Sequence, residues 1–168
     1  MKRAEESAKH YQTFEDLELY QGARAFRKAM YGLAHRLPAV EKFALASQIR
    51  RAAVSLTNNI AEGHGRFYFP EQIKFTLQAR GSLEELIDDL NTCEDEQYLA
   101  LIELTPLKEQ AWRVHKLVNG YLRFFRSRVG RSARVEETPG NDLGDAELDD
   151  LFFGPFNSST LERFNDSR

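Results

Sequence analysis

The sequence contains little cysteine, little proline and no long apolar run. Its 168 residues include 1 Cys and 5 Pro. A single cysteine excludes a disulfide framework and a zinc site built from several cysteines, and it fits a reducing compartment. No apolar segment approaches the roughly 20 residues that span a bilayer, and residues 1–6, MKRAEE, lack the apolar stretch of a signal peptide. We therefore expect a cytoplasmic protein with no membrane partner.

The sequence also lacks a large overall excess of charge of either sign. The formal net charge is −3, but the charges are unevenly distributed. Residues 98–129 carry 6 basic and 2 acidic side chains, whereas residues 67–97 carry 2 and 8. Residues 130–168 carry 4 and 9, so that everything before them sums to +2. This distribution predicts a mildly basic body followed by an acidic tail.

Apolar residues recur at alternating steps of three and four along four segments, which is the spacing of one side of a helix. We expect helices over about residues 14–37, 41–62, 70–97 and 106–129. We expect Thr13 to be the N-cap of the first helix, and Thr105 with Pro106 to start the fourth. Gly63-His64-Gly65 should end the second helix through a glycine in the left-handed conformation.

No segment of residues 1–129 alternates with the period of two that a strand requires. Four long amphipathic helices with short connections predict an all-α fold, an antiparallel up-down-up-down four-helix bundle. We expect the bundle domain over residues 13–129, preceded by an N-terminal extension at 1–12. Residues 130–168 are expected to form a mostly irregular acidic tail.

The tail contains an acidic and aromatic patch, ELDDLFFGPF, at residues 147–156. One interpretation is a flexible extension whose few apolar residues rest loosely on the body. The other is a short docking motif that becomes ordered on a partner or on a neighbouring subunit. Phe152, Phe153 and Phe156 would then be its anchors.

The second and third helices should be antiparallel neighbours, so residues at equal distances from the turn between them face one another. By this count Arg51 faces Glu85, and Ser55 faces Gly81 and Ser82. We expect a partly buried Arg51–Glu85 ion pair that fixes the register of this helical hairpin. Small residues opposite one another would allow the backbones to approach closely.

The residues that could carry catalysis do not converge in the sequence. The histidines are His10, His35, His64 and His115. None has a carboxylate at a metal-ligand spacing, and Cys93 continues an apolar stripe, which is typical of a small core residue. The paired acids at 84–85 and 88–89 lack the Glu-x-x-His motifs of di-metal bundles. We therefore expect no enzyme activity, no metal and no cofactor.

Basic side chains on the outer faces of the helices are the remaining functional signal. They serve ordinary surface solvation in most helical proteins, but in a symmetric assembly such a surface would attract nucleic-acid phosphates without reading sequence. The candidate nucleic-acid-binding residues are Arg24, Arg27, Lys28, Arg50, Arg113, Lys116, Arg123, Arg126 and Arg128.

Three motifs, in order and within the expected helices, give the chain a family resemblance. They are F-x-DL at residues 14–17 with Gln21 and Ala23, QIRRAAVS at 48–55 continuing to NIAEG at 59–63 and Gly65-Arg66, and A-x-GSL-x-E at 79–85. Over about residues 12–128 the chain resembles the bacterial four helix bundle protein family. Members of that family are encoded in intervening sequences of 23S ribosomal RNA genes and include the accessory variability determinant proteins of diversity-generating retroelements.

The resemblance implies a homopentamer of four-helix protomers with a basic outer surface. For retroelement members it implies binding to a reverse transcriptase and to RNA or DNA. Two features depart from the family pattern: the acidic tail and an aromatic connection, Phe67-Tyr68-Phe69, where relatives are usually polar. Our leading hypothesis is a non-enzymatic, oligomeric nucleic-acid-binding adaptor. The alternative is a protein–protein scaffold that uses the aromatic connection and the Phe-containing tail.

Overall fold

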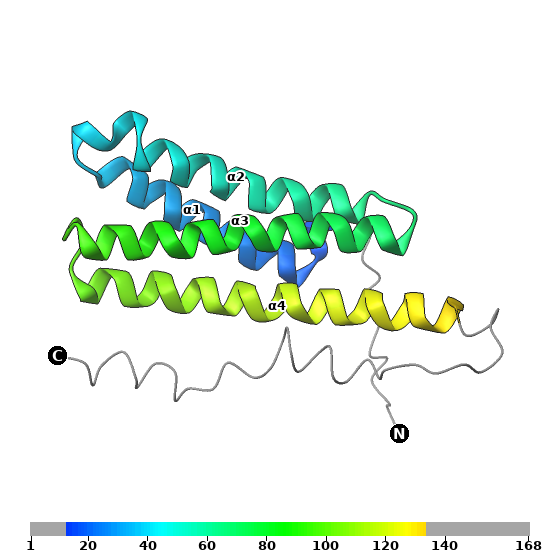
Figure 1. Cartoon of the computed structure of the whole chain (residues 1–168). Helices are drawn as coiled ribbons and strands as arrows, with labels where there is room; N and C mark the ends of the chain where they lie inside the picture. The colour runs from blue at the N-terminus through cyan, green and yellow to red at the C-terminus, as the bar shows by residue number, and fades with distance from the viewer. Residues whose placement is uncertain (1–12, 134–168) are drawn as a thin grey trace, which may run out of the picture. The chain divides into compact units, whose positions relative to one another are not determined.

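The computed structural model describes residues 13–133, which form four α-helices and two short 3-10 helices. The elements are η1 (Phe14–Asp16), α1 (Glu18–Arg36), η2 (Ala39–Phe43), α2 (Leu45–His64), α3 (Phe69–Asp95) and α4 (Leu101–Ala133). Successive helices run in opposite directions and lie side by side (Figure 1), which confirms the predicted four-helix bundle.

The N-terminal extension, most of the acidic tail and the anchors Phe152, Phe153 and Phe156 lie outside the described residues. Within residues 13–133 no helix combines the length and apolar character needed to cross a membrane.

The four apolar stripes meet in one core, as their spacing predicts. Phe26 and Met30 of α1 are fully buried, as are Leu56 of α2, Leu86 of α3 and Val118 of α4. Burial of such side chains is the main favourable term in the folding of a bundle of this size. Because each stripe faces inward, the polar side of every helix is left on the outer surface.

The first helix begins as its sequence suggests, although in two steps. Thr13 caps η1 with a reciprocal capping box, in which its hydroxyl accepts from the Glu15 N–H and the Asp16 carboxylate accepts from the Thr13 N–H. Leu17 is extended, so that α1 starts one residue later. The prediction that a glycine in the left-handed conformation ends the second helix is wrong. Helix α2 continues through His64, and Gly65 has φ −74°.

The start of the fourth helix lies earlier than the proline indicates. The helix begins at Leu101, so Pro106 is inside it and Thr105 is not an N-cap. The Glu103 carboxylate accepts the N–H of Ala100 at 3.3 Å, and the Thr105 hydroxyl donates to the Leu101 carbonyl at 2.8 Å. A proline in the first turns of a helix removes few backbone hydrogen bonds, so these contacts let α4 begin before it.

The pairing of α2 with α3 follows the predicted register in one contact and not in the other. The Ser82 hydroxyl donates to the Ser55 hydroxyl at 2.8 Å, which confirms that these residues face one another. The predicted Arg51–Glu85 ion pair is wrong: Arg51 is exposed and donates to the Ser47 hydroxyl of its own helix at 3.1 Å. With Ser55 opposite Ser82, the buried Leu86 rather than Glu85 takes the place across from Arg51.

Replacing either of two glycines in this hairpin by alanine should change the stability of the fold, in opposite directions for the two positions. A Cβ at Gly63 would lie 3.1 Å from the Phe75 Cβ, so Gly63→Ala pushes α2 off α3. A Cβ at Gly81 would meet nothing within 4 Å, so the expected close approach does not involve Gly81. Gly81→Ala should stabilise the fold by up to about 1 kcal/mol through helix propensity. Gly63→Ala should destabilise it by about 1 kcal/mol, since overpacking exceeds that gain. Urea unfolding of the two variants measures both changes in the free energy of unfolding. Two changes of the same sign would contradict the close contact at Gly63.

Candidate nucleic-acid interface

The outer side of α4 carries the densest group of exposed cations among the described residues. Arg113, Lys116 and Arg123 are exposed there, on the side away from the core residues Val114 and Val118. The sequence from 110 to 133 contains 6 Lys and Arg residues and no Asp or Glu. A cationic stretch without interspersed acids attracts polyanions.

The same surface continues along α4 and there includes an aromatic ring that sequence reasoning missed. Phe124 is 48% exposed, and the Arg128 guanidinium lies 5.2 Å from the centre of its ring. Arg126 and Arg128 are also exposed. Adjacent aromatic residues at 124 and 125 are a usable signal, because only one of two neighbours in a helix can face the core, and here Phe125 does.

Some of the predicted basic residues on α1 and α2 are exposed, whereas others bond to other elements of the bundle. Arg24 and Lys28 are exposed and line a shallow depression together with Glu15. Arg27 is half-buried, and its Nη1 donates to the Thr57 hydroxyl at 2.8 Å. Arg50 donates to the Lys42 carbonyl at 3.0 Å. We therefore assign Arg27 and Arg50 to holding elements of the bundle together.

The aromatic connection between α2 and α3 has two exposed rings and one that anchors it. Phe67 is 88% exposed and Tyr68 66% exposed. Phe69, in contrast, is half-buried, with its ring 5.9 Å from that of Phe125 on α4. The connection therefore lies at the end of the bundle where the basic part of α4 passes.

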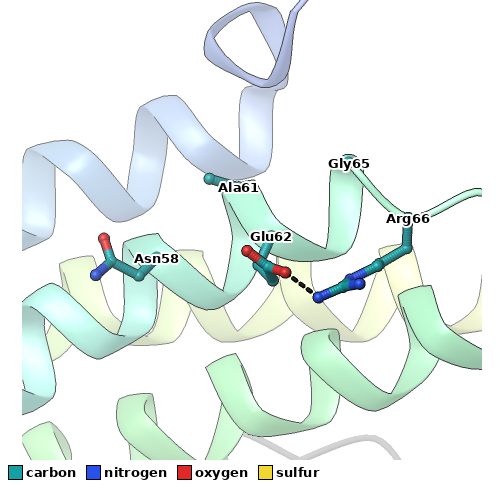
Figure 2. Close-up of a pocket in the computed structure, with 5 residues that line it drawn as sticks. All are labelled: Asn58, Ala61, Glu62, Gly65 and Arg66. Atoms are coloured by element: carbon teal, nitrogen blue, oxygen red, sulfur yellow. Dashed lines mark hydrogen bonds and ion pairs between the residues drawn. The ribbon is translucent and has the colours of Figure 1, made fainter.

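A shallow pocket on the outer side of α2 lies close to this connection. Its lining, Asn58, Ala61, Glu62, Gly65 and Arg66, comes largely from the second sequence motif, and Figure 2 shows the ion pair between Glu62 and Arg66 across it. The Arg66 guanidinium also lies 4.8 Å from the centre of the Phe75 ring on α3. The motif thus supplies contacts within the α2–α3 hairpin.

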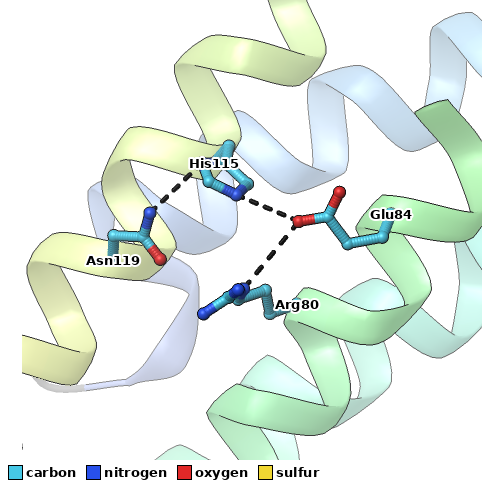
Figure 3. Close-up of polar contacts among 4 residues, drawn as sticks. All are labelled: Arg80, Glu84, His115 and Asn119. Atoms are coloured by element: carbon cyan, nitrogen blue, oxygen red, sulfur yellow. Dashed lines mark hydrogen bonds and ion pairs between the residues drawn. The ribbon is translucent and has the colours of Figure 1, made fainter. Parts of the chain in front are cut away.

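A polar cluster that the sequence did not suggest connects α3 and α4 (Figure 3). His115 Nε2 lies 3.0 Å from a Glu84 carboxylate oxygen, and its Nδ1 lies 3.2 Å from the Asn119 amide nitrogen. Arg80 lies 3.8 Å from the same Glu84 oxygen. Both ring nitrogens of His115 are therefore used within the protein, so this cluster joins two helices and offers neither nitrogen to a substrate.

The Cys93 side chain lies in the core, as its place in the apolar stripe predicts. It is fully buried, and burial raises the pKa of its thiol to about 11. Since the thiolate is the nucleophilic form, the thiol is unreactive near neutral pH.

Asp89 is the described carboxyl group most perturbed by its surroundings. Burial raises its pKa from 3.8 to about 6, and Asp88 and Glu85 add to the rise while Arg51 opposes it. The folded state therefore binds more protons than the unfolded state between about pH 4 and 6, so this group lowers stability as pH rises through that window.

Asp89→Asn is expected to raise the free energy of unfolding by about 1 kcal/mol near pH 7.5, a figure reduced because the carboxyl is only half-buried. The gain should disappear near pH 4, where the wild-type carboxyl is protonated. Urea unfolding across this range measures the difference, and Glu109→Gln, at an exposed carboxyl on α4, controls for net charge. A gain of equal size at both ends of the range would contradict the raised pKa.

Fold and surface together define a helical-bundle protein whose fourth helix presents a cationic outer side. The family model for the 23S rRNA-intervening sequence protein matches residues 15–120. The chain belongs to this family, in agreement with the resemblance in its three motifs. None of the curated proteins with which the chain was compared matches it. The matched range covers α1 to α3 and the first part of α4, whereas Arg123, Phe124, Arg126 and Arg128 lie beyond it.

Proposed function

We propose that the protein is a non-enzymatic, oligomeric adaptor that binds nucleic acid through the outer side of α4. The observation that carries this proposal is the run of exposed cations on α4 with no acidic residue in residues 110–133. The contacting residues are Arg113, Lys116, Arg123, Arg126 and Arg128. Such contacts hold phosphates without reading base sequence.

The family name refers to a 23S rRNA intervening sequence, which is consistent with an association with nucleic acid. An assembly of several subunits, a pentamer by resemblance, would repeat the α4 surface around its axis and strengthen a weak contact through multivalency. As an adaptor the protein would hold RNA or DNA beside a protein client, and the retroelement relatives suggest a reverse transcriptase as that client.

A salt titration of the full-length protein tests the proposal. Fluorescence anisotropy with a labelled RNA should give a logarithm of the binding constant that falls linearly with the logarithm of salt concentration. Five phosphate contacts per subunit would give a slope of about −3.5 to −4.5, at 0.7 to 0.9 per phosphate contacted. Affinity that does not change with salt, or no binding at low salt, would remove the proposal.

A further inference from the structure

One end of the bundle exposes several aromatic rings. Phe67 and Tyr68, between α2 and α3, are 88% and 66% exposed, and Phe124 of α4 is 48% exposed. We call these three residues the aromatic end. The rings of Phe67 and Tyr68 lie edge to face with centroids 5.3 Å apart. Exposed apolar surface of this kind marks an interaction site more often than it serves folding.

The backbone beneath these rings is held in place by several contacts. The Gln72 side chain donates to the Arg66 carbonyl at 2.6 Å, and the Tyr68 carbonyl accepts the N–H of Glu71 at 3.1 Å. Phe69 packs against Phe125 of α4, as described above. Binding to a surface that is already ordered loses little conformational entropy, so these exposed rings are well suited to contact a ligand.

A guanidinium group accompanies one of the rings. The Arg128 guanidinium lies over Phe124, whereas Arg66, which directly precedes Phe67, places its guanidinium over Phe75 of α3. The cations of this end outnumber its acids. The cations are Arg66, Lys74, Arg123, Arg126 and Arg128, and the acids are Glu62, which pairs with Arg66, and Glu71. Aromatic rings beside cations are what sequence-tolerant binding of a single strand requires, since bases stack on the rings while phosphates meet the charges.

The opposite end of the bundle shows that exposure alone does not single out this site. Phe43 is 85% exposed there, and Lys42 lies 5.2 Å from the centre of its ring. The neighbouring connection between α3 and α4 is acidic, however, with Asp95 and Glu96. A polyanion is therefore attracted to the end that carries Phe67 and not to the end that carries Phe43, which makes Phe43 a matched control.

We propose that the aromatic end binds unpaired bases of single-stranded nucleic acid by stacking, beside the α4 cations that hold the phosphates. The inference rests on the proposed function and adds to it the class of ligand, a single strand in preference to a duplex. A duplex keeps its bases stacked on one another and cannot offer their faces to Phe67, Tyr68 or Phe124.

The test measures binding of the full-length protein to a labelled uridine oligonucleotide, to a thymidine oligonucleotide of the same length and to an RNA duplex. Replacing Phe67, Tyr68 and Phe124 together by alanine should weaken binding of the single strands by at least about tenfold and change duplex binding by less than about twofold. All three side chains are exposed, so the variant should keep its fold. Phe43→Ala should leave every affinity unchanged.

Single substitutions separate stacking from general apolar contact. Phe67→Trp should retain binding of the single strand, whereas Phe67→Leu should weaken it about fivefold or more, because leucine is apolar but has no ring to stack. Irradiation with a strand containing 5-iodouridine gives a second readout, with crosslinks expected at Phe67, Tyr68 or Phe124. Equal binding of RNA and DNA strands would indicate any single strand, tighter RNA binding would indicate RNA, and both support the inference.

Several results would overturn it. If the triple variant binds single strand and duplex as the wild type does, or if crosslinks form only elsewhere, the inference fails while the proposed function stands. If Phe67→Leu binds like the wild type, or if the triple variant has a lower assembly mass by light scattering, the aromatic end is a protein contact. If no nucleic acid binds at low salt, the proposed function fails and this inference fails with it.

Discussion

Replacing Arg113, Lys116 and Arg123 together by glutamine is expected to weaken RNA binding several-hundredfold at about 50 mM salt. Each lost phosphate contact removes about 0.7 from the salt slope, so three such losses correspond to roughly 500-fold at this salt concentration when the affinities are taken as equal at about 1 M salt. At about 200 mM salt the same three losses correspond to only about 30-fold. The three side chains are exposed, so the free energy of unfolding should change by less than about 0.5 kcal/mol each.

A second triple variant provides the control. Replacing Arg24, Lys28 and Lys42 by glutamine gives the same change in net charge at exposed positions off α4. We expect it to weaken binding by less than about tenfold, because long-range attraction alone is screened over about 10 Å at moderate salt. Anisotropy titrations at the two salt concentrations measure both variants. Equal losses of RNA affinity in the two triple variants would mean that binding depends only on the net charge of the protein. That result would contradict a site on α4.

The fold could be predicted well because it depends on local periodicity. The spacing of residues such as Phe26, Leu56, Leu86 and Val118 identifies the inner side of each helix, and all four side chains are fully buried. Helix ends were less predictable because they depend on particular polar contacts. The start of α4, for instance, depends on the Glu103 carboxylate that accepts the Ala100 N–H.

The candidate site could be predicted in part. Periodicity correctly places Arg113, Lys116 and Arg123 on an exposed side, since it only has to exclude them from the core. It cannot show which cations bind other parts of the chain. Arg27 faces a hydroxyl group 30 residues away, and that distance is bridged only after α1 and α2 have packed.

The register of α2 and α3 shows the same limit in one hairpin. Counting from the turn places Ser55 opposite Ser82 correctly. A short side chain stays close to its own backbone, so residues that are backbone neighbours are also in contact. The same count is one residue out at Arg51, since with Ser55 opposite Ser82 it is Leu86 that takes the place across from Arg51, and the Arg51 guanidinium donates to Ser47. An error of one residue in the count hardly changes which small residues meet, but it is enough to remove a predicted ion pair.

Arg27→Met is expected to cost about 2 kcal/mol of stability and to leave RNA affinity within about threefold of the wild type. Its guanidinium donates to the Thr57 hydroxyl, which is 1% exposed, and hydrogen bonds of charged groups contribute about 1.5 to 3 kcal/mol. Methionine keeps most of the apolar stem, so the loss reports the polar contact. Arg24→Met, at an exposed position one turn away, should change stability by less than about 0.5 kcal/mol.

A double-mutant cycle with Thr57→Val separates the structural role of Arg27 from a nucleic-acid contact. Thr57 also donates to the Val54 carbonyl at 3.1 Å, so its hydroxyl lies within a small network between α1 and α2. Removing both partners should bring stability back to within about 1 kcal/mol of the wild type, because neither polar group is then buried without the other. Urea unfolding at one protein concentration keeps any effect of assembly constant across the four proteins. If the double variant is as unstable as the sum of the single variants, or if Arg27→Met alone weakens RNA binding more than tenfold, Arg27 belongs to the binding surface instead.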